Sequence, residues 1–346
     1  MEKSPGAGPG RLANCENLWR NGPDFEHEPE RMGHTRVFIH AAALISGAAI
    51  CIAAGVTGMA GQQGPGAPAQ AKQSTASPGA SPAAGQPASP PAIYGWALTW
   101  SDEFNGPNGS PPDPTKWTYD TGGNGWGNQE LEYYTRHREN AYVENGHLVM
   151  RAIREEFTGP DGVSRHYTSA RLKTEGIFAQ EYGRFEARIK IPEGQGIWPA
   201  FWLLGNNIEK TQWPECGEID IMENIGREPT EIHGSMHGPG YSGDLGLTAP
   251  ARLESERPFA EEYHIYAIEW EPQVVRFYVD SDLYATFTPM NLAPGLRWVF
   301  DHPFFILLNV AVGGGWPGAP DETTVFPQTM LVDYVRVYKK TTPEAP

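Results

Sequence analysis

Apolar and polar residues alternate with a period of two over much of the second half of the chain. Residues 184–192 read RFEARIKIP, which places the apolar side chains on one face of a strand and the charged side chains on the other. Similar β-rich runs, separated by Gly, Pro or Asp-Ser, follow at residues 263–272, 274–280, 304–314 and 331–340. These runs predict antiparallel strands with one buried face.

The remaining pattern from residue 93 onward is also typical of β structure. Asn145-Gly146 stands between two β-rich runs, which predicts a two-residue hairpin turn. Helical periodicity is absent apart from a short turn at residues 113–117. About a dozen short strands in one domain, residues 93–342, predict an all-β fold, a jelly-roll sandwich of two packed antiparallel sheets.

The first 92 residues differ in composition and divide into three segments. Residues 1–36 are predicted to be disordered. Residues 37–60 are apolar, contain no formal charge and follow Arg31 and Arg36, as expected of a signal anchor that crosses the membrane. An anchor is favoured for the sequence as written, and a long signal peptide is the alternative if translation begins at Met32. Residues 61–92 are nearly all Gly, Pro, Ala, Ser, Gln and Thr, the composition of a disordered linker.

Either alternative for residues 37–60 exports the domain, so an extracellular protein is expected, secreted or tethered to the outer face of the cell membrane. The net charge of −16 belongs to the domain, because residues 1–92 hold six basic and six acidic residues. Such a surface repels nucleic acid and anionic lipid, so neither is an expected partner, and membrane contact is expected only through residues 37–60. We expect no disulfide within the domain, because Cys216 is its single cysteine. A monomer is expected.

Three acids occur within six residues of the motif GEIDIMENIG, residues 217–226: Glu218, Asp220 and Glu223. A regular strand places Glu218 and Asp220 on one face and Glu223 on the other. One extra residue, a β-bulge within residues 221–222, brings all three acids to the same face. The motif therefore predicts a bulged strand with three carboxyl groups on one side.

Paired carboxyl groups on one face are what cleavage of a glycosidic bond requires. At a separation of roughly 5–5.5 Å, Glu218 attacks the anomeric carbon and Glu223 protonates the leaving oxygen, with retention of configuration, whereas a larger separation predicts inversion. Asp220 is predicted to support Glu218 and to raise the pKa of the acid that keeps its proton. The alternative is that the acids form ion pairs with Arg or Lys of adjacent strands.

Aromatic residues near the acids are candidates for binding sugar rings, although a tryptophan in a sandwich often belongs to the core. Four tryptophans qualify: Trp198, Trp202, Trp213 and Trp316. His233, Ser235 and His237 alternate, so they share a face of a strand predicted to neighbour the acidic one. Both histidines are candidate substrate contacts, and zinc is disfavoured because no cysteine pair or His-x-x-x-His helix exists.

Four sequence blocks, GRFEARIKIPEGQGIWPAFWLLG, WPECGEIDIMENIG, HGSMHGPGYSG and LNVAVGGGWPG, resemble the laminarinase-like branch of glycoside hydrolase family 16. The resemblance runs from about Trp100 to Tyr338. It implies a concanavalin-like jelly roll in which Glu218 is the nucleophile, Asp220 the assisting acid and Glu223 the general acid/base. The implied activity is endo-hydrolysis of β-1,3-linked glucan with retention, without a cofactor for the chemistry.

The resemblance also implies further site residues. GWGNQELEYYT resembles the glycone side of the family's cleft, which indicates Trp126, Asn128 and Glu130 as substrate contacts, and Arg188 is implied in the same way. Many relatives bind a structural calcium ion on the convex side, and the matching positions here are Glu103, Gly146 and Asp333. Gly315 departs from the polar residue that relatives often carry, so the subsite near Trp316 is expected to differ in affinity or specificity.

Two other functions fit the same residues. A transglycosylase forms the same covalent intermediate but transfers the glycosyl group to a sugar hydroxyl. For both the transglycosylase and the hydrolase, mixed-linkage glucan and agarose are alternative substrates. A non-catalytic carbohydrate-binding module on the same fold binds sugar without releasing reducing ends.

Overall fold

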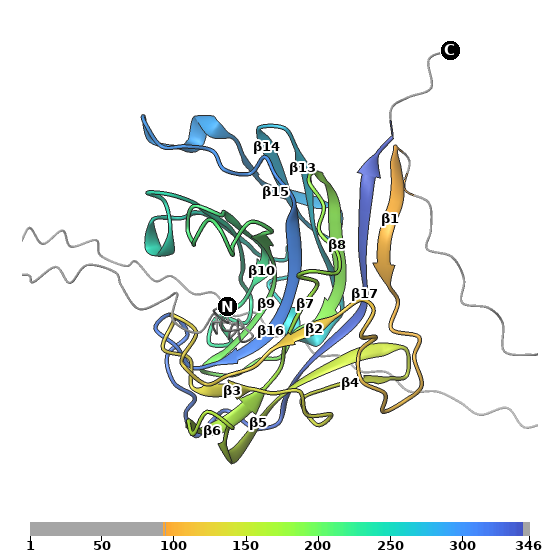
Figure 1. Cartoon of the computed structure of the whole chain (residues 1–346), viewed down its shortest axis with the longest axis vertical. Coiled ribbons are helices and arrows are strands. Elements are labelled where there is room, and N and C mark those ends of the chain that lie inside the picture. Colours follow the sequence, from red (N-terminus) through yellow and green to blue (C-terminus); the bar gives the residue numbers. More distant parts are fainter. Residues whose placement is uncertain (1–92, 94, 342–346) are drawn as a thin grey trace, which may run out of the picture. The chain divides into compact units, whose positions relative to one another are not determined.

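A computed structural model describes residues 93 and 95–341, which fold into two β-sheets (Figure 1). The helices within these residues are three short 3-10 turns: η2 (Gly243–Leu245), η3 (Phe259–Glu261) and η4 (Pro289–Asn291). No helix in the described part of the chain has the length and hydropathy to cross a membrane. The predicted segments 1–36, 37–60 and 61–92 lie outside the described residues.

The larger sheet has ten strands, and β8 and β17 pair at its centre. Its order is β15-β14-β13-β8-β17-β5-β6-β3, with β1 added on β17 and β4 on β5. The strands are β1 (Trp96–Asp102), β3 (Glu132–Tyr134), β4 (Ala141–Glu144), β5 (His147–Thr158), β6 (Ser164–Ser169), β8 (Gly183–Lys190), β13 (His264–Glu271), β14 (Val274–Val279), β15 (Asp282–Phe287) and β17 (Gln328–Lys340).

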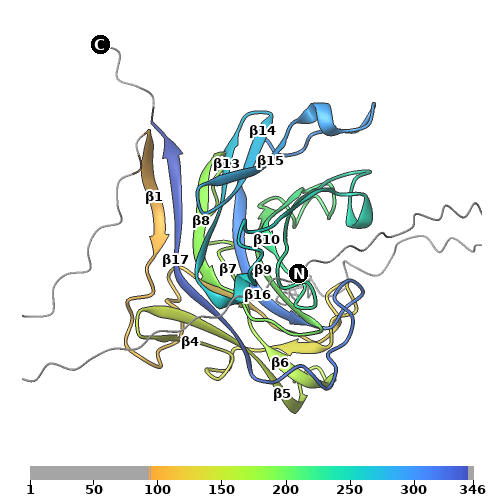
Figure 2. The same ribbon diagram turned by 180° about the vertical axis from the view of Figure 1, so that it is seen from behind.

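The smaller sheet has seven strands in the order β12-β11-β10-β9-β16-β7-β2, all paired antiparallel. They are β2 (Thr118–Asp120), β7 (Arg171–Lys173), β9 (Ile197–Gly205), β10 (Glu218–Glu223), β11 (Ile232–His237), β12 (Leu247–Ala251) and β16 (Phe304–Val312). Figures 1 and 2 show the two sheets as curved layers, with β8 and β13 in one and β9, β10 and β16 in the other.

The alternating apolar residues fill the space between the layers. On β8, Phe185, Ala187 and Ile189 are fully buried in the core, and on β9 the core residues are Ile197, Phe201 and Leu203. Burial of a large apolar side chain contributes roughly 1.5–3 kcal/mol, so this shared core is what holds the two sheets together. On β9 and β10, the side chains that alternate with the core residues point to the opposite face of the sheet, and the candidate site lies on that face.

The jelly-roll prediction and the hairpin are confirmed. Asn145 and Gly146 connect β4 to β5 with positive φ angles of 52° and 78°, the geometry that Asn-Gly turns favour. Two details differ from the prediction. The described residues form 17 strands, because three-residue strands such as β2 carry too little pattern to be recognised in sequence. In addition, β3 pairs with β6 in parallel.

The predicted bulge lies in β10. Asp220 pairs with Trp202 of β9 and Met222 with Phe201, so Ile221 is the extra residue without a partner of its own. Ile221 and Met222 are both fully buried in the core, so the strand places two successive residues on the same face. This shift turns Glu223 toward the outer face of the sheet together with the other two acids, as the parity of the sequence requires.

Candidate active site

A pocket on the outer face of the seven-stranded sheet contains all three acids of the motif. Strands β7, β9 and β16, the loop before β3 and the loop between β9 and β10 supply its other aromatic and polar side chains: Trp126, Asn128, Glu130, Arg171, Trp198, Trp202, Trp213 and Asn309. Six of these eight residues are among the candidates from the sequence, counting Glu130. Arg171 and Asn309 were missed.

Two tryptophan indoles hold the outer two acids. Trp213 Nε1 donates to Glu218 Oε2 at 2.6 Å, and Trp198 Nε1 donates to Glu223 Oε1 at 3.0 Å. Among the described residues, neither glutamate forms an ion pair with Lys or Arg. The alternative, that these two carboxyl groups form ion pairs with Arg or Lys of adjacent strands, is therefore wrong.

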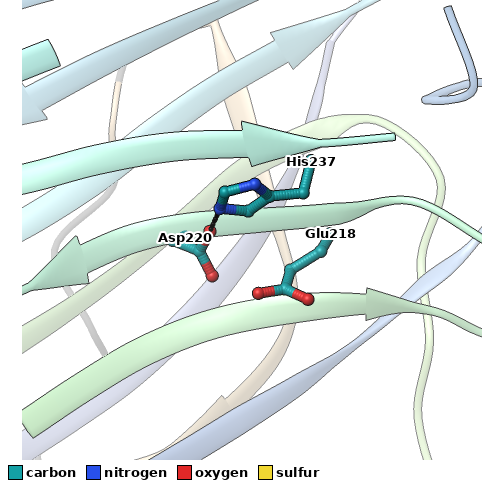
Figure 3. A group of neighbouring side chains, drawn as sticks. All are labelled: Glu218, Asp220 and His237. Carbon is teal, nitrogen blue, oxygen red and sulfur yellow. Dashed lines mark ion pairs between the residues drawn. The ribbon is translucent and has the colours of Figure 1, made fainter. Parts of the chain in front are cut away.

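Asp220 lies deeper than the two glutamates and contacts a histidine of the next strand. In Figure 3 its carboxyl group lies between Glu218 and the His237 ring, and His237 Nε2 is 3.2 Å from Asp220 Oδ2. His237 pairs with Glu218 across β10 and β11, and Gly246 leaves room for its ring, since a Cβ there would lie 2.4 Å from Cε1. The histidine is thus fixed against the central acid.

Burial gives two of the acids a tendency to keep their protons. Burial, followed by the charge of Glu218, raises the pKa of Asp220 well above its usual range. Burial also raises the pKa of Glu223 well above its usual range, and the charge of Asp220 adds to this, whereas His237 opposes it. A glutamic acid that retains its proton near neutral pH is suited to protonate a leaving group.

A cation is held between two aromatic rings on the β7 side of the pocket. The Arg171 guanidinium carbon lies 4.7 Å from the ring centroids of both Trp126 and Trp202. Asp120 Oδ2 lies 3.0 Å from Arg171 Nε and anchors it from the neighbouring strand. Arg171 carries no sequence signal, since one arginine in a short polar strand is ordinary.

A chain of hydrogen bonds connects the same side of the pocket. Trp202 Nε1 donates to Asn309 Oδ1 at 2.8 Å, and Asn309 Nδ2 donates to the Tyr134 hydroxyl at 3.2 Å. The Tyr134 hydroxyl donates to Glu130 Oε2 at 2.9 Å, and Asn128 Nδ2 donates to Glu130 Oε1 at 3.1 Å. Asn309 had a readable signal, because it is the single polar residue in the buried run FFILLNVAV.

The remaining predicted aromatic contacts, Trp316 and His233, lie next to the pocket on the β11 side. The Trp316 ring lies 5.5 Å from Trp198 and 5.0 Å from His233, in edge-to-face geometry. Burial lowers the pKa of His233, with Glu231 partly opposing this. Trp316 is 36% exposed, so its ring is accessible to a ligand that extends past Glu223.

The structure corrects the prediction that Arg188 contacts the substrate. Arg188 lies on β8 of the ten-stranded sheet, where its Nη1 is 2.8 Å from Asp333 Oδ2 and its guanidinium stacks on Tyr263. It does not line the pocket. Sequence alternation placed it on a charged face of a strand but did not indicate to which sheet that strand belongs.

The two carboxylates among the predicted calcium ligands are each paired with an arginine. Both oxygens of Glu103 accept hydrogen bonds from Arg336, Asp333 pairs with Arg188, and Gly146 lies in the β4–β5 turn. A guanidinium beside each carboxylate repels a cation, so this arrangement does not fit calcium. Calcium at these positions stays a prediction without support from the contacts.

Because the pKa values of Asp220 and Glu223 are raised in the folded state, these two acids should make the folded protein less stable as pH rises. A group whose folded pKa is above its unfolded value contributes stability that is present below the unfolded pKa, about 4 here, and is lost toward the folded pKa. We therefore expect Asp220→Asn and Glu223→Gln to raise the melting temperature at pH 7 by at least about 2–4 °C and to leave it unchanged near pH 4. Exposed Glu209→Gln serves as the control in calorimetry. Variants whose melting temperatures equal that of the wild type at both pH values would contradict the raised pKa values of the two acids.

Comparison with known proteins agrees with this geometry. Residues 128–336 match the family described as glycosyl hydrolases family 16. The β-glucanase of Rhodothermus marinus is 45% identical over 254 residues, which cover 70% of this chain and 85% of that protein.

Two solved structures are also similar. The endo-β-1,3-glucanase of Pyrococcus furiosus has a TM-score of 0.68 and 50% identity, covering 71% of this chain and 95% of that one. The laminarinase catalytic domain of Thermotoga maritima MSB8 has a TM-score of 0.67 and 51% identity, covering 71% and 99%. Because the family match spans more than half of the sequence and the 45% identical β-glucanase is covered over 85% of its length, the chain belongs to glycosyl hydrolases family 16 and is a glycosidase.

Proposed function

We propose that this glycosidase is an endo-acting hydrolase of β-1,3-linked glucan that retains configuration through a double displacement. The observation that carries the proposal is the bulge in β10, because it directs Glu218, Asp220 and Glu223 into one pocket. The names of the two similar solved structures, an endo-β-1,3-glucanase and a laminarinase, support β-1,3-glucan as the substrate. The pocket itself supports a neutral sugar polymer.

The first displacement forms a covalent intermediate. Glu218 Oε attacks the anomeric carbon, and Glu223 gives its proton to the glycosidic oxygen as the carbon–oxygen bond breaks. Trp213 holds the attacking carboxylate and Trp198 the proton donor. In the second displacement Glu223, now ionised, takes a proton from water, which attacks the anomeric carbon and releases Glu218.

The charges lining the pocket favour neutral substrates. Its acids are the three of the motif and Glu130, whereas Arg171 is the single basic residue among the lining side chains. Sulfated or carboxylated polysaccharides would meet this acidic surface unfavourably. Tryptophan faces contact the apolar faces of unsubstituted sugar rings without any such cost.

We further propose that the enzyme acts as a monomer outside the cell, secreted or tethered to the outer membrane face through residues 37–60. The apolar run, the polar linker at residues 61–92 and the acidic domain support this location. Fractionation of cells that express the full chain tests it, since activity confined to the cytoplasm would contradict it.

A side-by-side assay on laminarin, curdlan, lichenan and agarose tests the substrate. We expect the highest rate of reducing-end release on laminarin, with oligosaccharides of several lengths among the early products because the cleavage is internal. Binding without reducing ends would identify a carbohydrate-binding module, and a preference for agarose would contradict the proposed linkage. Products that lengthen in excess acceptor, with little hydrolysis, would identify a transglycosylase.

A further inference from the structure

A second pair of acids is buried beside the pocket. Glu130, Glu132 and Tyr134 alternate along an extended segment that enters β3, so their side chains share a face. Glu130 is 4% exposed and lines the pocket, and Glu132 is 0% exposed. Within the described residues, neither acid has a Lys or Arg ion-pair partner, which is unusual for buried carboxyl groups.

The hydrogen bonds of the two carboxyl groups differ. Glu130 accepts a hydrogen bond from Asn128 on one oxygen and from Tyr134 on the other, so both of its oxygens have a donor. Glu132 Oε2 accepts from the Val312 backbone N–H at 2.7 Å, but its buried Oε1 has no donor. An orphaned buried oxygen costs about 1–3 kcal/mol, and a proton on Oε1 removes that cost by making it a donor.

The surroundings place the proton on Glu132. Burial raises the pKa of Glu132 well above its usual range, and the adjacent Glu130 charge raises it further. Other titratable groups near it are Tyr134, whose pKa burial also raises, and Arg171 of β7, which acts on Tyr134. β6 contributes Tyr167 opposite Glu132, and β16 contributes the Val312 N–H.

We propose that Glu132 is a positioning residue that remains protonated at neutral pH and donates a hydrogen bond to Glu130, which fixes Glu130 and Asn128 in the substrate cleft. The inference deepens the proposed function and rests on it. Glu130 is the last acceptor in the chain of hydrogen bonds that runs from Trp202 through Asn309 and Tyr134. Ionisation of Glu132 would place two like charges side by side and displace the end of this chain.

Two substitutions separate a hydrogen-bond donor from a space-filling role. Glu132→Gln keeps a donor toward Glu130 and an acceptor for Val312, so its KM for laminarin should stay within about twofold of the wild type at pH 7. Glu132→Leu removes both, and its KM should rise about tenfold with a smaller change in kcat. A tenfold rise in KM for both variants would contradict the proposal.

The proton itself is visible by infrared difference spectroscopy, which does not depend on activity or on the Leu variant folding. At pH 7 the spectrum of the wild type minus Glu132→Gln should show the band of a protonated carboxylic acid, and a carboxylate band in its place would overturn the proposal. The exposed Glu144→Gln should show a carboxylate band as the matched control. A wild type inactive on laminarin would contradict the proposed function, and the spectrum would still locate the proton.

Discussion

Replacing Glu218 with glutamine is expected to lower kcat on laminarin by at least about 10⁴-fold, because an amide does not form the glycosyl–enzyme bond. The fold should be retained, since the glutamine oxygen still accepts the hydrogen bond that Trp213 donates to Glu218. Rates of reducing-end release at saturating substrate, together with thermal unfolding, measure both effects.

Glu215→Gln is the matched control for this experiment. Glu215 is exposed, lies three residues before Glu218 in the loop that precedes β10 and does not line the active-site pocket, so its substitution should leave kcat unchanged. Hydrolysis by Glu218→Gln at the wild-type rate would exclude Glu218 as the nucleophile.

The second large effect is expected for Glu223→Gln, which should lower kcat on glucan by about 10²–10⁴-fold. The loss should be much smaller for aryl glycosides with acidic phenol leaving groups, because their leaving oxygen needs little protonation. In the wild type, activity on glucan should fall as pH rises through the raised pKa of Glu223. The variant should lack that alkaline decline.

Equal losses on glucan and on activated aryl glycosides would contradict the role of Glu223 as proton donor. An alkaline decline that persists in Glu223→Gln would assign it to another group. Both results come from the same kinetic series, measured across pH on the two substrate classes.

The acid triple could be predicted from sequence because a bulge has a parity signature. A regular strand would divide the three acids between its two faces. One extra residue in the strand is the simplest way to place them all on one face, with the apolar residues around them on the other. The structure confirms it, with Ile221 unpaired and both Ile221 and Met222 in the core. Strand runs and the Asn-Gly turn were predictable for the same reason, since each depends on local geometry.

Long-range placement was not predictable in the same way. Arg188 has the alternation of a strand residue, but that pattern is identical for both sheets, and pairing with β13 and β17 assigns it to the sheet without the pocket. Arg171 became visible only when the fold placed it between Trp126 and Trp202, which come from distant parts of the chain. Local periodicity contains no information about either contact.

The buried Glu132 shows a third limit of sequence reading. Next to Glu130 in GNQELEYYT it looks like an ordinary solvent-facing acid, and only its complete burial and its unpaired Oε1 distinguish it. Which acid of a strand is buried depends on what packs over it, here the segment that ends with Val312.

The most direct test of the account is to trap the glycosyl–enzyme intermediate with a 2-deoxy-2-fluoro β-glucan oligosaccharide that carries a good leaving group. After proteolysis, tandem mass spectrometry locates the labelled residue. A label on Glu218 is the predicted result. A label on Glu223 or Asp220, or a product released with inverted configuration and no labelled peptide, would contradict the assignment of Glu218 as the attacking carboxylate.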